Sequence, residues 1–465
     1  MSSLIVLECN EVPLSIFEWY ARENSGSHIG RFLKDGRIGT TVAAADGSGV
    51  RDLYPSQTWA TLAMGIPFEK HGVYWYGDPK PAEFPLYWQV AAGERRVGIV
   101  NTLHSSPFAE QCSQNGLVFA LPDVFAMDDD ARPTHLGPFQ AFTRSMTSKN
   151  GRAVRSKLPV KEFASGLSAA RRAGVRQVTF GRLTQLVAGV ASGRVSKERF
   201  RTAQFLLSAD VFMSELEAHE PDLAVCFTNH VAAAMHRYWP ASFPDDWDDA
   251  PYPPDWIEEH RDEIPQALHA FDAFLGRVLR YADQNGATVL IASSMGQVGG
   301  VEVEKVVEGA ARVVVDPERF GRWLGVPDDG EHASAMVPHV TYRFPTPERA
   351  MEVKRDLLQR NIDDGQLVVD QSGDAVTVTY SLNAQGRYLN LDGVQTPMAD
   401  AGVEAIDVSE GRSGVHDPIG TLMLYGGADV ALPDEPVDVL EVAPAILTAL
   451  GIEPLSHHVE PTFVI

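Results

Sequence analysis

Five short apolar runs along the chain have the pattern of buried strands in a parallel sheet. They are rich in β-branched residues and are flanked by turn-forming residues. The runs are residues 4–9, 97–103, 223–228, 288–292 and 421–425. Between them, apolar positions recur every three or four residues, which is typical of helices with one buried face. The alternation predicts an α/β fold, a mostly parallel sheet with helices on both faces.

Two helical segments illustrate the second pattern. In residues 266–284, Leu268, Phe271 and Leu275 fall on one face of a helix. Near the C-terminus, residues 437–450 predict a last helix that ends at Gly451, because glycine commonly follows the final helical residue.

Two regions interrupt this alternation and predict insertions into the core fold. Residues 1–120, 201–300 and 411–465 are expected to form the α/β core, and residues 121–200 a partly helical insertion. Residues 301–410 are expected to form a small α/β cap. In it, residues 338–344 have a strand pattern, Thr346 and Pro347 begin a helix, and Ser372-Gly373-Asp374 marks a hairpin turn.

Composition and charge exclude some function classes. The 465 residues include 39 basic and 62 acidic ones, for a net charge of −23, whereas a nucleic-acid surface needs clustered Lys and Arg. Cys9, Cys112 and Cys226 are few, odd in number and near apolar segments, which indicates reduced core cysteines. No apolar run approaches the length of a membrane span, and the N-terminus lacks the pattern of a signal peptide. We therefore expect a cytoplasmic protein that acts neither on nucleic acid nor at a membrane.

Polar side chains gather next to the predicted strands. A lone histidine at a strand end is usually structural, but several polar strand ends of one sheet meet in a single crevice. The residues concerned are Glu8, Asn10, Glu11, His104, Asn229, His230, His236, Ser293, Ser294 and His416. The pattern predicts a ligand site at this edge of the sheet.

Thr58 stands between Pro55 and a helix of small residues, "ATLAMG". Its hydroxyl has two interpretations. It either caps the helix, or it is a nucleophile at a helix end whose dipole favours an incoming anion.

The segment around Thr58, "YPSQTWATLAMGIPFEKHGV", resembles the nucleophile segment of the alkaline phosphatase superfamily, in its type I phosphodiesterase and nucleotide pyrophosphatase branch. Three later segments resemble further parts of that family in the same order: residues 223–240, 271–293 and 416–454. The resemblance covers about half of the chain. It implies an alkaline-phosphatase-like sheet and, for Thr58, the position of the nucleophile.

The resemblance also implies two metal ions, and here the chain departs from the family. His236 and His416 fall on ligand positions. At other ligand positions stand residues unsuited to a hard, phosphate-bridging metal. These are Asn10, Ala232, Ser294 and Met295. At most one divalent metal is therefore expected, zinc before others, with His230 and Glu8 or Glu11 as further ligands.

Three hypotheses follow from these residues. In the first, the protein is a hydrolase or transferase for a small anionic phosphate ester, with Thr58 at the reacting centre and one metal. In the second, no metal takes part, and His104 or Glu8 accepts the proton of Thr58. In the third, the fold binds an anionic ligand without catalysis. Under each, Asn10, Asn229, Ser293 and Ser294 are candidate ligand-binding residues.

Overall fold

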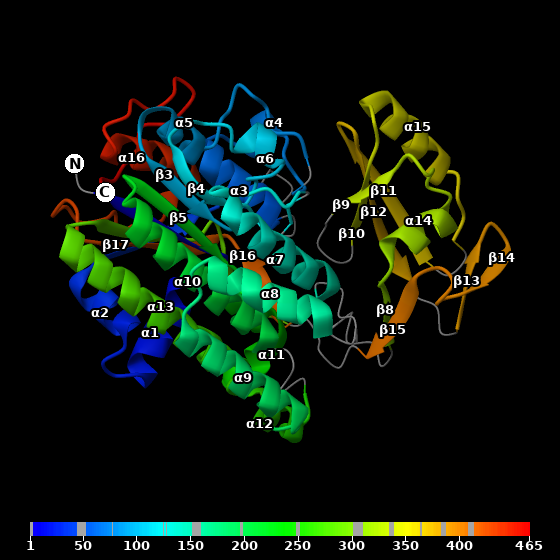
Figure 1. Cartoon of the computed structure of the whole chain (residues 1–465), viewed down its shortest axis with the longest axis horizontal. Helices are drawn as coiled ribbons and strands as arrows, with labels where there is room; N and C mark the ends of the chain where they lie inside the picture. The colour runs from blue at the N-terminus through cyan, green and yellow to red at the C-terminus, as the bar shows by residue number, and fades with distance from the viewer. Residues whose placement is uncertain are drawn as a thin grey trace.

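An eight-stranded sheet forms the centre of the molecule in a computed structural model of the chain (Figure 1). The structure describes residues 3–43, 53–76, 78–123, 125–126, 128–150, 160–195, 199–247, 252–300, 310–333, 339–362, 365–382, 387–407 and 413–465. The strand order is β18-β2-β17-β6-β1-β5-β3-β4. The bounds are β1 Leu4–Cys9, β2 Arg37–Val42, β3 Val97–Val100, β4 Leu117–Leu121, β5 Leu223–Thr228, β6 Thr288–Ala292, β17 Ile419–Tyr425 and β18 Val437–Asp438.

The predicted mostly parallel α/β sheet is confirmed. β1 pairs in parallel with β5 and β6, and β3 pairs in parallel with β4 and β5. β17 is the exception, because it runs antiparallel to both of its neighbours, β6 and β2. The sequence patterns did not predict β2 and β4. They also extended β3 too far: it ends at Val100, because Asn101 has a positive φ of 58°.

Helices cover both faces of the sheet, and β1 shows how its residues divide between them. Ile5, Leu7 and Cys9 belong to one hydrophobic core, and Leu4 and Val6 to the other, as the two-residue period of a strand requires. Helices on the first face are α1 Leu14–Glu23, α2 His28–Asp35, α10 Phe200–His219, α11 His230–Ser242 and α13 Glu263–Asn285. Helices on the second face are α3 Pro55–Met64, α5 Tyr87–Glu94 and α16 Val442–Ala449.

The last helix is shorter than the sequence predicted. It begins at Val442, and the residues before it form strand β18 and a 3₁₀ turn, Val439–Glu441. Asp438 explains the change, because its carboxylate accepts a hydrogen bond from the Leu440 amide and caps the turn.

In the described part of residues 121–200 there are three α-helices. They are α7 Gly137–Asn150, α8 Val160–Arg172 and α9 Gln177–Ala191. Side chains from this region, among them Phe139 and Leu183, pack into the first core. Further short elements of the main body include α4 Phe68–His71, α6 Phe108–Gln111, α12 Pro254–His260 and the 3₁₀ turns Thr134–Leu136 and Pro244–Asp246.

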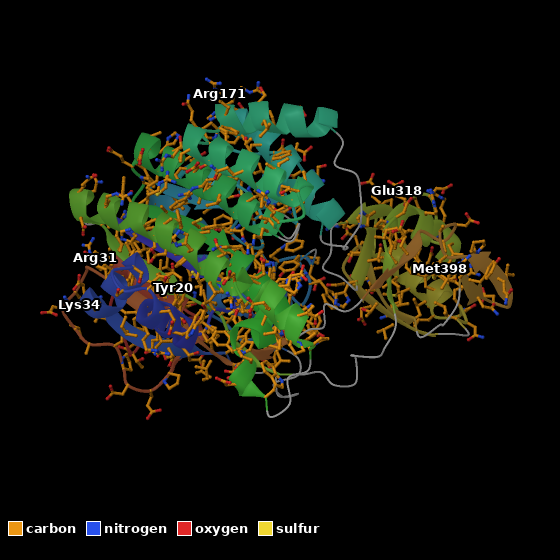
Figure 2. The ribbon with its side chains drawn as sticks, turned by 90° about the horizontal axis from the view of Figure 1, so that it is seen from below. Tyr20, Arg31, Lys34, Arg171, Glu318 and Met398 are labelled. Atoms are coloured by element: carbon orange, nitrogen blue, oxygen red, sulfur yellow. The ribbon has the colours of Figure 1, made fainter. Side chains whose placement is uncertain are left out.

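The second insertion has a hydrophobic core of its own, built from residues between Val314 and Val403. We call it the inserted unit; Figure 2 shows it beside the main body, with Glu318 and Met398 marking it. Its sheet has the order β11-β12-β10-β9. The bounds are β8 Ala310–Val314, α14 Pro317–Leu324, β9 Glu331–Ala333, β10 His339–Arg343, α15 Pro347–Leu357, β11 Gly365–Ser372, β12 Ala375–Leu382, β13 Tyr388–Leu391, β14 Val394–Pro397 and β15 Val403–Asp407.

Local predictions within the inserted unit are confirmed. Thr346 caps α15, and its side chain accepts a hydrogen bond from the Arg349 amide at 3.2 Å. Ser372 pairs with Ala375 across the two-residue turn of the β11–β12 hairpin.

In the described part of the chain, no helix is long and apolar enough to cross a membrane.

Candidate functional site

Asn10 links three elements at the carboxyl edge of the sheet. Its side-chain amide donates to Glu11 Oε1 and to Asn229 Oδ1, both at 2.8 Å, and its Oδ1 accepts from Trp59 Nε1 at 2.7 Å. Glu11 follows β1, Asn229 follows β5, and Trp59 lies in α3. Since every polar atom of the Asn10 side chain already has a protein partner, it holds these elements together. The structure therefore gives no support to substrate binding by Asn10.

Glu11, His236 and His416 form a compact cluster of ligand-type side chains. Glu11 Oε2 lies 2.8 Å from His236 Nε2 and 3.4 Å from His416 Nε2. Among the described residues, these three form the group that could hold a metal ion, with ligand atoms all within 4.8 Å of one another. We call them the Glu11–His236–His416 cluster.

Three different elements bring this cluster together. Glu11 turns out of β1 with a positive φ of 55°, an uncommon conformation for a residue with a side chain. His236 lies in α11. His416 lies in β16 Gly414–Asp417, which pairs with β7 Gly296–Gly299 and places His416 opposite Gln297. Because β17 is antiparallel, the segment that precedes it, including His416, lies at the same edge as the carboxyl ends of β1 and β5.

The electrostatics of the cluster favour an ionised carboxylate. Burial disfavours the charge of Glu11, but the charges and hydrogen bonds of His236 and His416 outweigh it and hold the pKa of Glu11 well below its usual range. The Gln297 side-chain amide also donates to Glu11 Oε2.

The cluster fits a divalent metal such as zinc. Zinc in proteins commonly takes histidine nitrogens and carboxylate oxygens, and catalytic sites use three protein ligands. His236 Nδ1 bonds the Gly414 carbonyl at 2.9 Å, which leaves Nε2, the atom facing Glu11, as the ligand nitrogen. One carboxylate and two imidazoles therefore form a suitable ligand set.

His230 and Glu8, two residues predicted as metal ligands, lie outside the cluster. His230 Nδ1 bonds Thr228 Oγ1 at 2.5 Å and its Nε2 bonds the Ala267 carbonyl at 3.0 Å. Its ring is stacked on Phe205 with ring centroids 3.7 Å apart, and burial lowers its pKa to about 3. His230 is thus a packed structural residue.

Glu8 points to the opposite face of the sheet from the first core, as Leu4 and Val6 do. There its Oε1 accepts a hydrogen bond from the Tyr87 hydroxyl at 2.9 Å. Burial raises the pKa of Glu8 to about 7. Glu8 thus interacts with Tyr87 of α5 and with Thr102, and Glu11 is the glutamate that lies beside His236 and His416.

Thr58 lies inside α3 and does not cap it. The N-cap is Tyr54, whose side chain makes no capping hydrogen bond, and the Thr58 amide already donates to the Tyr54 carbonyl at 2.9 Å. The capping interpretation of the Thr58 hydroxyl is therefore wrong. Its Oγ1 instead lies 2.8 Å from Ser294 Oγ, and both side chains are buried.

His104 and Ser293 make contacts other than those predicted. His104 Nε2 bonds the Ser56 carbonyl at 2.7 Å, so the ring contacts the backbone two residues before Thr58 rather than its hydroxyl. Burial holds the pKa of His104 well below its usual range.

The Ser293 hydroxyl donates to the Cys9 carbonyl at 2.5 Å and also lies 3.1 Å from the Val12 carbonyl, which ties β6 to the end of β1. Met295 packs with Ala43 and Leu53.

Aromatic residues connect Thr58's helix to the cluster. Tyr54, at the start of α3, has its ring centroid 6.4 Å from that of His416, and Trp59 bonds Asn10. Neither Tyr54 nor Trp59 was predicted as a site residue, and nor was Gln297. Gln297 had one available signal, since it lies three residues after Ser294 in the same segment.

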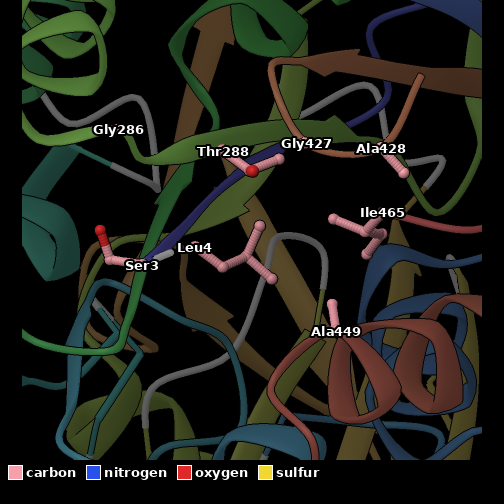
Figure 3. Close-up of a pocket in the computed structure, with 8 residues that line it drawn as sticks. All are labelled: Ser3, Leu4, Gly286, Thr288, Gly427, Ala428, Ala449 and Ile465. Carbon is pink, nitrogen blue, oxygen red and sulfur yellow. The ribbon is translucent and has the colours of Figure 1, made fainter. Parts of the chain in front are cut away.

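A separate cavity lies at the opposite edge of the sheet (Figure 3). It has a volume of about 330 Å³ and is next to the first residues of β1 and β6, Leu4 and Thr288. Its lining residues are Ser3, Leu4, Gly286, Thr288, Gly427, Ala428, Ala449 and Ile465. No histidine, cysteine, acidic or basic side chain is among them, so this cavity lacks the metal-ligand side chains that the Glu11–His236–His416 cluster has.

Comparisons with known proteins find structural similarity only. No protein-family model matches the chain, and no curated protein sequence matches it. The chain is similar to phosphonoacetate hydrolase from Sinorhizobium meliloti 1021, with 14% identity, 97% of this chain and 96% of that chain covered, and a TM-score of 0.42. It is similar to alkaline phosphatase PafA, with 12% identity, 99% and 98% covered, and a TM-score of 0.46. It is also similar to murine ectonucleotide pyrophosphatase/phosphodiesterase 5, with 10% identity, 98% and 97% covered, and a TM-score of 0.39.

Proposed function

We propose that the protein is a hydrolase or transferase for a small-molecule phosphate ester, with Thr58 at the reacting centre. In this proposal one divalent metal, zinc, is held by Glu11, His236 and His416. The observation that carries it is the placement of this ligand set at the edge of the sheet where Ser294 meets Thr58. Small anionic esters are the substrate class that fits this arrangement, because a metal cation would attract the anion and a buried hydroxyl could attack it.

Each residue has a role that follows from its contacts. The Thr58 oxygen forms the new bond to phosphorus as the bond to the ester oxygen breaks, and the Thr58 proton ends on that oxygen, which leaves as an alcohol. Water, or an acceptor alcohol in a transferase, then takes the phosphoryl group and returns a proton to Thr58. Ser294, at 2.8 Å, orients the Thr58 hydroxyl. Asn10 fixes Glu11 relative to α3 through its bonds to Glu11 and Trp59. A metal in the cluster would supply positive charge that stabilises the phosphoryl oxygens.

Metal content and activity test the proposal together. We expect about one zinc per chain, lost in His236→Ala and in His416→Ala and retained in Ser294→Ala. We also expect hydrolysis of at least one member of a phosphate-ester panel, abolished by chelator and restored by Zn²⁺. Ser294→Ala is the matched control, because it lies beside Thr58 but offers no metal ligand.

The other outcomes separate the alternative hypotheses. Full activity in chelator, with no metal in the purified protein, would replace the proposal by a metal-independent enzyme. Zinc binding without turnover of any phosphate or sulfate ester would indicate a ligand-binding protein on this fold.

A further inference from the structure

Gln297 is a buried glutamine that contacts the Glu11–His236–His416 cluster without being one of its three members. It lies in β7, is 0% exposed, and pairs with His416 of β16. Its Nε2 donates to Glu11 Oε2 and also lies 3.4 Å from the Ala232 carbonyl. Gln297 thus touches the Glu11 carboxylate from outside the ligand set.

The oxygen of the Gln297 amide has no hydrogen-bond partner among the described residues. A buried polar atom without a partner destabilises the folded state. Leucine or methionine would fill the same space without that cost. The hydrogen bond from the amide to the Glu11 carboxylate is strong, because its acceptor is charged. This bond explains why an amide stands at the position.

The strand opposite Gln297 leaves room for its amide at Gly414. A Cβ atom at Gly414 would lie 2.5 Å from Gln297 Oε1 and 2.8 Å from the Met235 carbonyl oxygen. The Gly414 carbonyl also accepts the hydrogen bond from His236 Nδ1 at 2.9 Å. Because Gly414 closes the oxygen side of the amide, the nitrogen side stays directed at Glu11.

A metal in the cluster would change how Glu11 is held. Glu11 Oε2 lies 2.8 Å from His236 Nε2 and 3.4 Å from His416 Nε2. An imidazole nitrogen that binds a metal uses its lone pair and has no proton to donate, so neither histidine could then donate to Glu11 through Nε2. Among the described residues, the other hydrogen bonds to this carboxylate come from Gln297, to Oε2, and from Asn10, to Oε1. These two bonds do not involve the histidine nitrogens, so they are compatible with a bound metal.

We propose that Gln297 is a positioning residue that holds the Glu11 carboxylate toward the metal site. Its bond acts on Oε2, the oxygen that faces both histidines, whereas Asn10 acts on the other oxygen. Loss of a group that hydrogen-bonds to a metal ligand typically lowers metal affinity about 10- to 100-fold. This inference rests on the metal binding in the proposed function and adds a residue that supports it.

Metal titration of the metal-free full chain tests the inference without a measurement of activity. Competition with a chromophoric chelator gives the affinity for Zn²⁺, and the visible absorption of bound Co²⁺ reports the ligand geometry around the ion. We expect Gln297→Met to weaken Zn²⁺ binding about 10- to 100-fold. It should also change the Co²⁺ spectrum, because the carboxylate is then free to turn. Gln297→Asn keeps an amide but is shorter by one methylene, so it should change both in the same direction and serves if Gln297→Met does not fold.

Gln140→Met is the matched control. Gln140 is also 0% exposed, its Nε2 donates to the Asp123 carbonyl at 3.2 Å, and its Oε1 likewise has no partner among the described residues. This variant should keep the Zn²⁺ affinity and the Co²⁺ spectrum of the unsubstituted protein. Unchanged affinity and spectrum in the Gln297 variants would overturn the inference and leave the proposed function standing. Failure of the unsubstituted protein to bind either metal would overturn both.

Discussion

Side chains in this site differ in whether all of their polar atoms already have hydrogen-bond partners in the protein. Asn10 has both amide hydrogens and its oxygen bound to protein groups, whereas Thr58 Oγ1 hydrogen-bonds, among the described residues, to the hydroxyl of Ser294 alone. A hydroxyl paired with a hydroxyl keeps acceptor capacity for a ligand. The Asn10 amide therefore has its hydrogen-bonding groups occupied by the protein, whereas the Thr58–Ser294 pair can still accept a hydrogen bond.

Thr58→Ala should remove most ester hydrolysis with little loss of stability. The substitution deletes one buried hydrogen bond, which costs about 1 kcal/mol of unfolding free energy. Thr58→Ser keeps the hydroxyl and should retain measurable turnover. Steady-state kinetics and urea unfolding of both variants test this. Full activity in Thr58→Ala would exclude Thr58 from the mechanism, and unfolding of that variant would assign it a structural role.

Glu8→Gln should stabilise the protein at alkaline pH. Burial raises the pKa of Glu8 to about 7 in the folded protein, from an ordinary value of 4.5. Between these values the folded chain binds a proton that the unfolded chain lacks, so stability falls as pH rises and the cost is complete above pH 7. Glu8→Gln removes this cost, so it should raise the free energy of unfolding by up to ~3 kcal/mol at pH 8 and change it little near pH 4.5.

Urea unfolding at pH 5 and pH 8 measures the effect of Glu8→Gln. Glu18→Gln, at an exposed position in α1, is the control and should show no such pH dependence. A Glu8→Gln variant that loses stability at both pH values would show that an amide cannot replace the carboxyl group beside the Tyr87 hydroxyl.

The C-terminus of helix α3 is fixed in place by tight packing. Its C-terminus is closed by Gly65 in the left-handed conformation, with φ of 62°. A Cβ atom at Gly65 would lie 2.8 Å from His458 Cδ2 and 3.3 Å from the Leu440 carbonyl oxygen. His458 Nε2 bonds the Met64 carbonyl at 3.1 Å, so the last turn of α3 is fixed to the C-terminal segment.

Gly65→Ala should therefore cost more than an ordinary glycine substitution at positive φ. The left-handed backbone alone costs about 1 kcal/mol, and displacement of His458 adds to it, for a total of roughly 2 kcal/mol or more. Gly26→Ala is the matched control, because Gly26 has φ of 85° and nothing within 4 Å of the added Cβ. Thermal unfolding of the two variants measures the loss of stability in each. Equal losses would show that the His458 side chain moves aside without an energetic cost.

Element patterns show which parts of the fold were predictable. β1, β5 and β6 were predicted with their observed bounds because they are continuous apolar runs buried on both faces. β2 was missed because its sequence, RIGTTV, is half polar and mostly only partly buried. Register and direction of β17 depend on pairing with distant strands, and no local pattern in its sequence specifies them.

The site was predictable to a similar degree. Residue type and strand position predicted that Thr58 would lie near Ser294 and His236 near His416, as the structure has them, while their roles in catalysis and metal binding stay predictions. Glu8 and His230 were misassigned because the sequence does not state which face of β1 a carboxylate occupies or which backbone carbonyl a buried imidazole meets. The choice between Glu8 and Glu11 required the positive φ of Glu11, a feature of the folded chain.

At the scale of the whole molecule, the inserted unit contacts the loop that follows α4. Trp75 and His339 have ring centroids 4.1 Å apart, and Ser372 hydrogen-bonds to Asp78. Gly373 approaches Pro79 so closely that a Cβ there would lie 2.6 Å from Pro79 Cγ. The inserted unit therefore helps to position the loop that follows α4.

His339→Ala should raise the KM for the ester substrate severalfold and leave the thermal unfolding of the main body unchanged. The substitution removes an aromatic contact worth about 1 kcal/mol from the junction, without touching either core of the central sheet. Tyr388→Ala, at an exposed tyrosine of β13, is the control from the same unit. An unchanged KM in His339→Ala would show that the junction does not influence substrate binding.

The position of β17 also has a consequence for biosynthesis. β17 lies between β2 and β6, although it is made after the inserted unit and β6 precedes it by more than a hundred residues of chain. Until residues 419–425 leave the ribosome, β2 and β6 have no common neighbour, and each leaves an edge open to pairing with other chains. His416 is translated just before β17, so the third residue of the Glu11–His236–His416 cluster leaves the ribosome with the strand that joins β2 to β6. A nascent chain that stalls earlier lacks both β17 and the third residue of the cluster. Under the proposed function, metal retention would therefore distinguish finished chains from truncated ones.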